Sequence, residues 1–171
     1  MYTIVAGHQI GNYKIGMTTG AMLAEMQASP TALRDVRTWM SGMYTVVHQS
    51  ADRQCQVSSD LRIGLVVLVA LVGSSRASTS SGIRVGMSIG EALQLDDTLY
   101  LDFESEQFTS RSDPGVYFGL EDREPYVKDD FSSHIIERIE VTNRHLLDEI
   151  LIARLDASIL EDIRRKYIVG R

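Results

Sequence analysis

The sequence is poor in cysteine, in aromatic side chains and in long hydrophobic runs. Cys55 is the one cysteine among 171 residues, so a disulfide within the chain is excluded and a reducing compartment is favoured. We interpret Cys55 as a small, half-buried side chain rather than a nucleophile, because free cysteines usually serve in packing. The length and the apolar fraction of 44% are those of an ordinary globular chain that buries its own core.

No stretch of the sequence is long enough to cross a membrane. The longest apolar run, Leu65–Val72, falls well short of the about 20 residues that a membrane-spanning helix requires. Its valines and leucines predict instead a strand that is buried on both faces. Residues 1–10 contain no Lys or Arg and do not resemble a signal peptide. We therefore expect a cytoplasmic protein without a membrane partner.

Positive charge is also scarce, and the formal net charge is −6. Residues 1–81 carry six basic and four acidic side chains, whereas residues 82–171 carry eleven basic and nineteen acidic ones. The acidic excess is concentrated in residues 96–130, where eleven acids stand against three bases. Because an acidic surface repels nucleic acid and attracts basic proteins, we expect a basic protein partner and no nucleic acid.

The sequence contains one short phrase in two copies. The copies occupy residues 14–23 and 84–93, which are 70 residues apart, and read KIGMTTGAML and RVGMSIGEAL. We call them the repeated phrase. Self-similarity of this kind indicates an internal repeat, so each copy opens roughly one half of the chain.

Each copy of the repeated phrase predicts a glycine turn followed by the start of a helix. Gly16 and Gly86 allow a backbone conformation that other residues avoid, and Thr18 and Ser88 are suited to the N-cap of a helix. Ser88 with Glu91 also has the spacing of a capping box. The phrase lacks the Gly-Lys-Ser/Thr ending and the full dinucleotide pattern, so a structural turn is favoured over a phosphate site.

The other patterns predict mainly strands. In the first half we expect strands in residues 1–6, 13–15, 44–48 and 54–57, and a second helix over Thr31–Met40. In the second half we expect strands over 99–103, 107–109 and 116–118. A strand over Leu61–Val66 resembles Glu137–Thr142 at an offset of 76, which predicts a longer connection in the second half.

These elements predict an α+β fold of two tandem repeats, each a helix plus antiparallel strands, with a C-terminal helix. Gly73–Ser81 is rich in serine and predicts a flexible linker. From Asn143 onwards apolar residues recur at spacings of three and four, which predicts one helix, or two with a break near Asp156. The predicted parts are a first repeat over 1–72, the linker over 73–81, a second repeat over 82–142 and the C-terminal helix over 143–171.

The residues that could carry chemistry form no recognisable catalytic or metal-binding pattern. His8, His48, His134 and His145 lie at no metal-ligand spacing from one another or from Cys55, and we expect His48 to be half exposed. We therefore expect no metal and no cofactor. Carboxylates are plentiful, so a glycosidase-type acid pair stays an alternative, although an aromatic content of 7% is low for a sugar site.

The acids of the second half predict a docking patch for a basic protein surface, with solvated surface charges as the other interpretation. Interleaved aromatic residues such as Tyr100, Phe103 and Tyr117 would supply the anchors that binding hot spots favour. The candidate partner-binding residues are Asp96, Asp97, Asp102, Glu104, Glu106, Glu121, Asp122, Glu124, Asp129 and Asp130.

Two tandem units that open on Gly-Met-Thr or Gly-Met-Ser, each followed by antiparallel strands, resemble β-lactamase inhibitory proteins and the related outer-membrane small lipoproteins. Residues 82–88, 113–116 and 136–141 also resemble small cytosolic immunity proteins of bacterial toxin systems. The resemblance implies a protein that binds another protein. The chain departs from the secreted inhibitors in having no export signal, no cysteine pair and no Gly-x-Pro after the helices.

We therefore expect a non-enzymatic inhibitor, an immunity protein whose acidic surface plugs the basic cleft of a cognate bacterial toxin. One alternative is a carboxylate-based hydrolase, which a deep pocket with two acids within about 10 Å would favour. The other is a self-associating structural or adaptor module, in which the C-terminal helix would mediate a homodimer.

Overall fold

The computed structural model describes residues 2–26, 33–39, 43–50, 52–73, 76–120, 131–153 and 156–168, with side chains for all of these except 33–39, 43 and 44. The first half begins with a small sheet of β1 (Ile4–Val5), β2 (Gln9–Ile10) and β3 (Tyr13–Lys14). Its further elements are α1 (Thr19–Glu25), β4 (Leu33–Trp39), β5 (Met43–Gln49), β6 (Cys55–Asp60) and β7 (Val66–Val72).

The second half also runs from a helix into strands. Its elements are α2 (Ile89–Leu95), β8 (Leu99–Asp102), β9 (Gln107–Ser110), β10 (Val116–Leu120), a 3-10 turn at Phe131–Ser133 and β11 (Ile136–Thr142). The described chain then forms α3 (Arg144–Ile152) and α4 (Ala157–Tyr167). Helices and antiparallel sheets occur together, which confirms the predicted α+β class.

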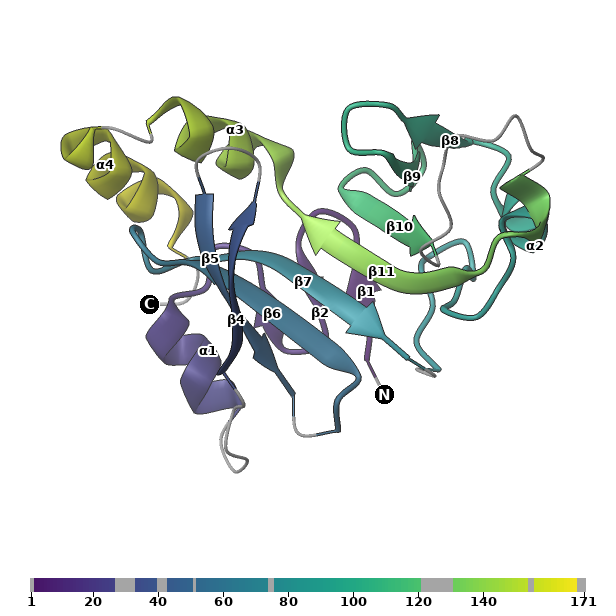
Figure 1. The fold of residues 1–171 in the computed structure, drawn as a ribbon, viewed down its shortest axis with the longest axis horizontal. Coiled ribbons are helices and arrows are strands. Elements are labelled where there is room, and N and C mark those ends of the chain that lie inside the picture. The colour runs from purple at the N-terminus through teal and green to yellow at the C-terminus, as the bar shows by residue number, and fades with distance from the viewer. Residues whose placement is uncertain are drawn as a thin grey trace.

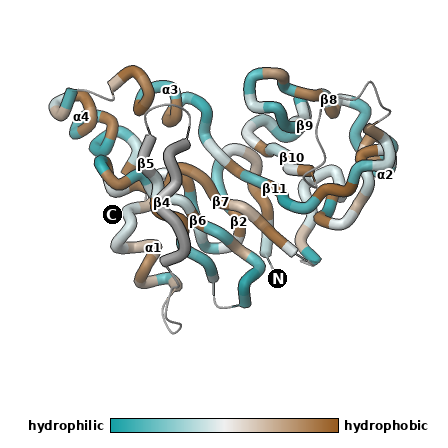
Figure 2. Tube along the Cα trace, viewed as in Figure 1, coloured by the Kyte–Doolittle hydropathy of each residue, from teal (hydrophilic) through white to brown (hydrophobic). Residues whose placement is uncertain are grey.

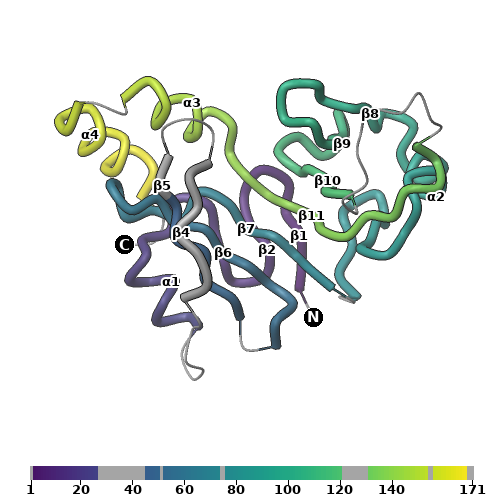
Figure 3. The backbone as a smooth tube through the Cα atoms, viewed as in Figure 1, coloured from purple at the N-terminus to yellow at the C-terminus, as the bar shows by residue number. Residues whose placement is uncertain are grey.

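The eight strands from β4 to β11 form one antiparallel sheet in the order β4-β5-β6-β7-β11-β10-β9-β8. The two halves meet at β7 and β11, where Ala70 lies opposite Glu140. The sheet is therefore continuous across the molecule, as Figure 1 shows. In Figure 3 the chain leaves β7, crosses to α2 and β8 at the far end, and returns through β11 to α3 and α4.

The two copies of the repeated phrase make matching hydrogen bonds. The N–H of Gly16 donates to the carbonyl of Val66, and the N–H of Gly86 donates to the carbonyl of Ile136, both at 2.8 Å. Both donors and both acceptors are 70 residues apart. The phrase thus has the same local role in each half, because it joins the start of a helix to the start of a central strand.

The central strands correspond at an offset of 70, not at the predicted offset of 76. Isolated bridges pair Thr18 with Leu65 and Ser88 with Ile135, so positions 65 and 135 are equivalent. The strand expected over Leu61–Val66 is wrong for most of its length, because residues 61–63 form a turn and β7 begins at Val66. The similar letters of 61–66 and 137–142 therefore do not mark equivalent positions.

The helix predicted over Thr31–Met40 is also wrong, because its described part, Leu33–Trp39, is strand β4. β4 pairs with β5 along its length, and Val36 lies opposite Val46. Branched and aromatic residues favour strands, and pairing with a neighbouring strand outweighs a short helical spacing. The first half therefore contains one described helix, α1, just as the second half contains α2 before its strands.

The main core joins the central strands of the large sheet to the small sheet, α1, α2 and the C-terminal helices. In the central strand β7, all residues from Val66 to Leu71 are buried, as predicted for a strand that is buried on both faces. Figure 2 shows the hydrophobic colour concentrated along β7 in the middle of the molecule. The fully buried side chains of this core include Met22, Leu65, Leu71, Ile89, Phe118, Ile139, Leu146 and Ile150.

The C-terminal helices and the serine-rich segment have no equivalent in the other half, and both contribute buried residues to this core. Of the two arrangements expected for the C-terminus, one helix or two with a break near Asp156, the structure has two helices, α3 and α4. Asp156 caps α4, and its carboxylate accepts from the N–H of Ser158 at 2.9 Å. The described end of the serine-rich segment is not a free linker, because Ala77 and Thr79 are buried. The hydroxyl of Ser80 also donates to Asp113 at 2.6 Å.

Candidate functional site

A groove lies between the β8–β9 hairpin and α3. We call it the hairpin groove, and its volume is about 390 Å³. This volume lies in the range of sites that hold a small ligand or an inserted side chain. The groove is lined by Asp102, Glu104, Ser105, Gln107, Tyr117, Glu140, Thr142, Arg144, Leu147, Asp148 and Leu151.

The wall formed by the hairpin is built from the turn between β8 and β9. Asp102 ends β8, and its carboxylate accepts from the N–H of Glu104 at 3.1 Å and from the hydroxyl of Ser105 at 2.9 Å. Glu106 closes the turn in the left-handed region, with φ of 55°. The aspartate therefore shapes the turn and also presents the adjoining glutamate to the groove.

The opposite wall is one face of α3. Arg144, Leu147, Asp148 and Leu151 are spaced by three, four and seven residues, which places them in one row along a helix. A different row, with Leu146 and Ile150, faces the core and is fully buried. The helix therefore packs through one side and lines the groove with another.

Arg144 joins the two walls. Its guanidinium lies 3.6 Å from the carboxylate of Asp102 and forms an ion pair with Glu104. The hydrogen bond that Arg144 donates to the carboxylate of Glu104 raises the pKa of Arg144, so the guanidinium stays charged. The side chain is 53% exposed, which makes this a surface ion pair of modest strength.

The floor of the groove belongs to β9, β10 and β11. Glu140 is only 7% exposed, and it accepts from the amide of Gln107 at 2.9 Å and pairs with Arg138 at 2.9 Å. Tyr117 lies opposite Glu140 in the sheet, and burial raises the pKa of its hydroxyl group. The deepest carboxylate is thus neutralised within the chain, while the hairpin acids lie nearer the surface.

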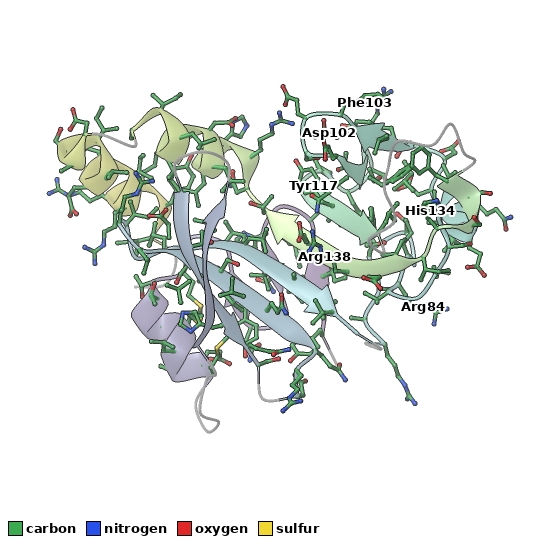
Figure 4. The ribbon with its side chains drawn as sticks, in the orientation of Figure 1. Arg84, Asp102, Phe103, Tyr117, His134 and Arg138 are labelled. Atoms are coloured by element: carbon green, nitrogen blue, oxygen red, sulfur yellow. The ribbon has the colours of Figure 1, made fainter. Side chains whose placement is uncertain are left out.

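Two highly exposed apolar side chains adjoin groove-lining residues in the sequence, and we call them the rim of the groove. Phe103, at the start of the hairpin turn, is 85% exposed, and Ile152, in the last turn of α3, is 81% exposed. Figure 4 shows Phe103 at the outer end of the hairpin, with Asp102 and Tyr117 closer to the middle of the molecule. The groove is therefore lined by acidic side chains, and exposed apolar residues adjoin its lining residues in the sequence.

The structure divides the predicted acidic residues into three groups. Asp102 and Glu104 line the groove, and Glu106 and Asp97 are exposed on the surface. Asp96 is 6% exposed, and its carboxylate accepts from Ser112, Thr98 and Ser110 within the chain, so it faces inward and cannot contact a partner. The remaining predicted residues, Glu121, Asp122, Glu124, Asp129 and Asp130, lie outside the described residues.

Sequence reasoning did not place Glu140, Arg144 or Asp148 at this site. Arg144 and Asp148 follow the helical spacing of the C-terminal segment, which we had associated with self-association. Their spacing of four showed that they share a helix face, but nothing local showed that the face turns toward a hairpin 40 residues away. Glu140 alternates with buried strand residues and therefore resembles an ordinary surface position.

Two other hollows are less suited to bind a partner. One of about 340 Å³ is lined by Tyr2, Asn12, Tyr13, Glu25 and Asp52, and its polar groups bind one another. The hydroxyl of Tyr2 donates to Asp52 at 2.9 Å, and the amide of Asn12 donates to Glu25. The other hollow, of about 80 Å³, is shallow and adjoins the groove at Glu140.

The isolated titratable residues offer little chemistry. Cys55 is fully buried rather than half buried, and burial raises the pKa of its thiol. His48 is also buried rather than half exposed, because its strand faces the core there, and burial lowers its pKa. Within the described residues, no three His, Cys, Asp or Glu side chains converge in a way that could hold a metal ion.

The groove holds a pair of acids, but the pair is already engaged. The oxygen atoms of Asp102 and Glu104 face the guanidinium of Arg144, which covers the positions that a hydrolase substrate would have to reach. The arrangement is better suited to bind a cation than to transfer a proton.

Among the described helices, none combines the length and apolar character needed to span a bilayer. The chain matches no protein-family model, no curated protein and no solved structure. The resemblance carried by the repeated phrase therefore stays a prediction, and the interpretation of function depends on the groove itself.

Proposed function

We propose that this protein is a non-enzymatic inhibitor of the immunity type, which binds a bacterial toxin through the hairpin groove and its rim. One observation carries the proposal: four acidic side chains line the hairpin groove, and Phe103, the most exposed large apolar side chain of the described structure, lies between two lining residues in the sequence. The proposal assigns the protein to the bacterial cytoplasm, where it would meet its toxin.

The combination of charge and exposed apolar surface supports binding to a protein. Acidic groups at a surface attract a basic partner from a distance and fix its orientation, while a desolvated aromatic side chain supplies affinity. Phe103 is exposed to water in the free protein, and covering it with a partner would remove this apolar surface from water, which is favourable. A toxin that acts on nucleic acid or nucleotides has the basic cleft that this surface would fit.

The test uses the protein encoded beside this gene in its native host. Expressed alone in bacteria, that protein should arrest growth, and co-expression of this chain should restore growth. The variant Asp102→Lys/Glu104→Lys should weaken the complex by about 100-fold or more, because like charges would then face each other. Growth rescue and the dissociation constant of the purified pair are the measurements.

A matched control carries the same change in charge elsewhere. Glu137→Lys/Asp162→Lys alters two exposed acids that do not line the groove, and it should retain rescue and affinity. Melting temperatures of both variants show whether each is folded. The proposal is wrong if the neighbouring protein does not arrest growth, or if the hairpin variant rescues as well as the control.

A further inference from the structure

We infer that the hairpin groove accepts an arginine side chain of the partner, which takes the place of the chain's own Arg144. The inference rests on the proposed function and specifies the chemistry of the contact. Arg144 demonstrates that a guanidinium reaches both hairpin carboxylates, since its Nη1 faces Asp102 at 3.6 Å and its Nη2 pairs with Glu104. An incoming guanidinium would find the same oxygens from the solvent side.

The position of Arg144 in α3 makes it easy to displace. It is the first residue of the helix, directly after the N-cap Asn143. A cation is disfavoured there because the positive end of the helix dipole lies at the N-terminus. The side chain is 53% exposed, so its ion pairs gain little in water. A partner's arginine that carries no such penalty can replace it.

The groove also offers more acid than Arg144 neutralises. Four lining residues are acidic, Asp102, Glu104, Glu140 and Asp148, whereas Arg144 is the one basic lining residue. With Glu140 paired to Arg138, three acidic lining residues remain, and Arg144 pairs with two of them, Asp102 and Glu104. A second cation is therefore favoured in the groove by the remaining charge.

Arginine fits this site better than lysine. A planar guanidinium can donate to two carboxylates at once, whereas an ammonium group acts as a point charge. The ring of Tyr117 and the apolar side chains of Leu147 and Leu151 line the same groove and can contact the flat guanidinium and its stem. The partner would thus present an arginine on a projecting segment.

The experiment uses the complete isolated protein and a small probe. N-acetylarginine methylamide is titrated into the ¹⁵N-labelled protein, and backbone amide shifts are followed by NMR. The neutral isostere N-acetylcitrulline methylamide is the control ligand. We expect saturable shifts at residues of the hairpin and α3 with the arginine probe, none with citrulline, and loss of binding as salt screens the charges.

Two variants give changes in opposite directions. Asp102→Asn/Glu104→Gln should weaken binding of the arginine probe about tenfold, because the charged acceptors are lost. Arg144→Gln should strengthen it several-fold, because the competing guanidinium is removed and the groove becomes more acidic. If Arg144 instead contacted the ligand, Arg144→Gln would weaken binding of the arginine probe. This variant therefore distinguishes displacement of Arg144 from direct contact with it.

Shifts that spread over acids outside the groove, equal shifts with citrulline, or weaker binding by Arg144→Gln would each overturn the inference. These results are separable from failure of the proposed function. If toxin binding depends on Asp102 and Glu104 but the isolated protein does not bind the arginine probe, the proposed function is supported and the arginine inference is wrong. If the protein binds the arginine probe but neutralises no toxin, the arginine site is supported and the proposed function is wrong.

Discussion

Asp96 shows how one carboxylate can organise several loops. It accepts hydrogen bonds from Thr98 at 2.6 Å, from Ser112 at 2.5 Å and from Ser110, and it lies 3.3 Å from the hydroxyl of Ser81. Burial alone would raise its pKa, but the hydroxyl groups of Ser110, Ser112 and Thr98 together hold the pKa well below its usual value. The residue thus links the end of α2, the β9–β10 turn and the serine-rich segment.

Replacing Asp96 should therefore change how stability depends on pH. A carboxyl group whose pKa is lower in the folded state stabilises fully above its unfolded pKa of about 3.9, and that stabilisation disappears as the pH falls further. Asp96→Asn should lower the free energy of unfolding by about 2 to 3 kcal/mol at pH 7. It should also flatten the loss of stability below about pH 4.

Urea unfolding at several pH values measures both effects. Asp97→Asn, at the exposed neighbouring position, is the matched control and should change the free energy of unfolding by less than about 0.5 kcal/mol. An Asp96→Asn protein with the same acid sensitivity as the natural chain would show that the hydroxyl groups do not act through the charge.

Gly115 is a second residue on which packing depends. Its φ is +83°, and a Cβ there would lie 2.6 Å from the Cα of Gly7 and 2.6 Å from the carbonyl oxygen of Thr142. Gly115→Ala should cost about 3 kcal/mol or more, because backbone must move and the conformation is strained. Gly20→Ala, whose Cβ meets nothing within 4 Å, should be neutral or slightly stabilising in the same denaturation assay.

At the scale of elements, the helix starts are the features that could be predicted best. Thr18 caps α1, and Ser88 with Glu91 forms the predicted capping box of α2. Caps depend on residues three positions apart, so local spacing suffices to find them. The strand β4 could not be recognised in the same way, because its state is decided by pairing with β5 rather than by its own residues.

The two caps also predict different sensitivities. Ser88→Ala removes two bonds of the Ser88 hydroxyl, which accepts from the N–H of Glu91 at 3.2 Å and donates to the Glu91 carboxylate at 3.0 Å. The backbone N–H of residue 88, which donates to the same carboxylate at 2.8 Å, is kept. Thr18→Ala removes a single 3.2 Å bond. Ser88→Ala should cost about 1 to 2 kcal/mol and Thr18→Ala less, as measured by urea denaturation. Equal costs would mean that the box adds nothing to the simple cap.

The groove was predictable only in part, for the same physical reason. Asp102 and Glu104 lie in one acidic stretch, so composition was enough to single them out. Asp96 belongs to that stretch as well, but the chain turns it inward, and charge density alone cannot distinguish the two cases. Arg144 comes from a helix that meets the hairpin only because β11 returns across the sheet. A contact between such distant segments can be predicted only when the complete fold is known.

At the scale of the molecule, the large sheet joins two similar halves into one body. Ala70 and Glu140, which are 70 residues apart, face each other at its centre. A two-fold relation between the halves would give this pairing, since each position would then face its own equivalent across β7 and β11. The acidic member of this pair is Glu140, which belongs to the second half and lines the hairpin groove. The equivalent position in the first half is Ala70, which carries no acid.

The C-terminal helices give the last prediction at this scale. Leu146 and Ile150 are fully buried and Ile163 is 3% exposed, and all three belong to the main core. Burying three such side chains stabilises a fold by about 5 to 8 kcal/mol, which is comparable to the whole stability of a typical domain. A chain that ends at Thr142 should therefore lose its cooperative thermal transition instead of merely changing its oligomeric state.

The self-association alternative is tested separately on the intact chain. Ile152→Asp/Ile159→Asp alters apolar side chains that are 81% and 43% exposed, so the core should stay folded and the melting temperature nearly unchanged. If the helices mediate a homodimer, light scattering should show the mass of this variant falling to that of a monomer. If the helices serve the core and the groove, as their buried and groove-lining faces indicate, the masses of the variant and the natural chain should be equal. For the chain that ends at Thr142, a thermal transition that is still cooperative would contradict the structural role of α3 and α4.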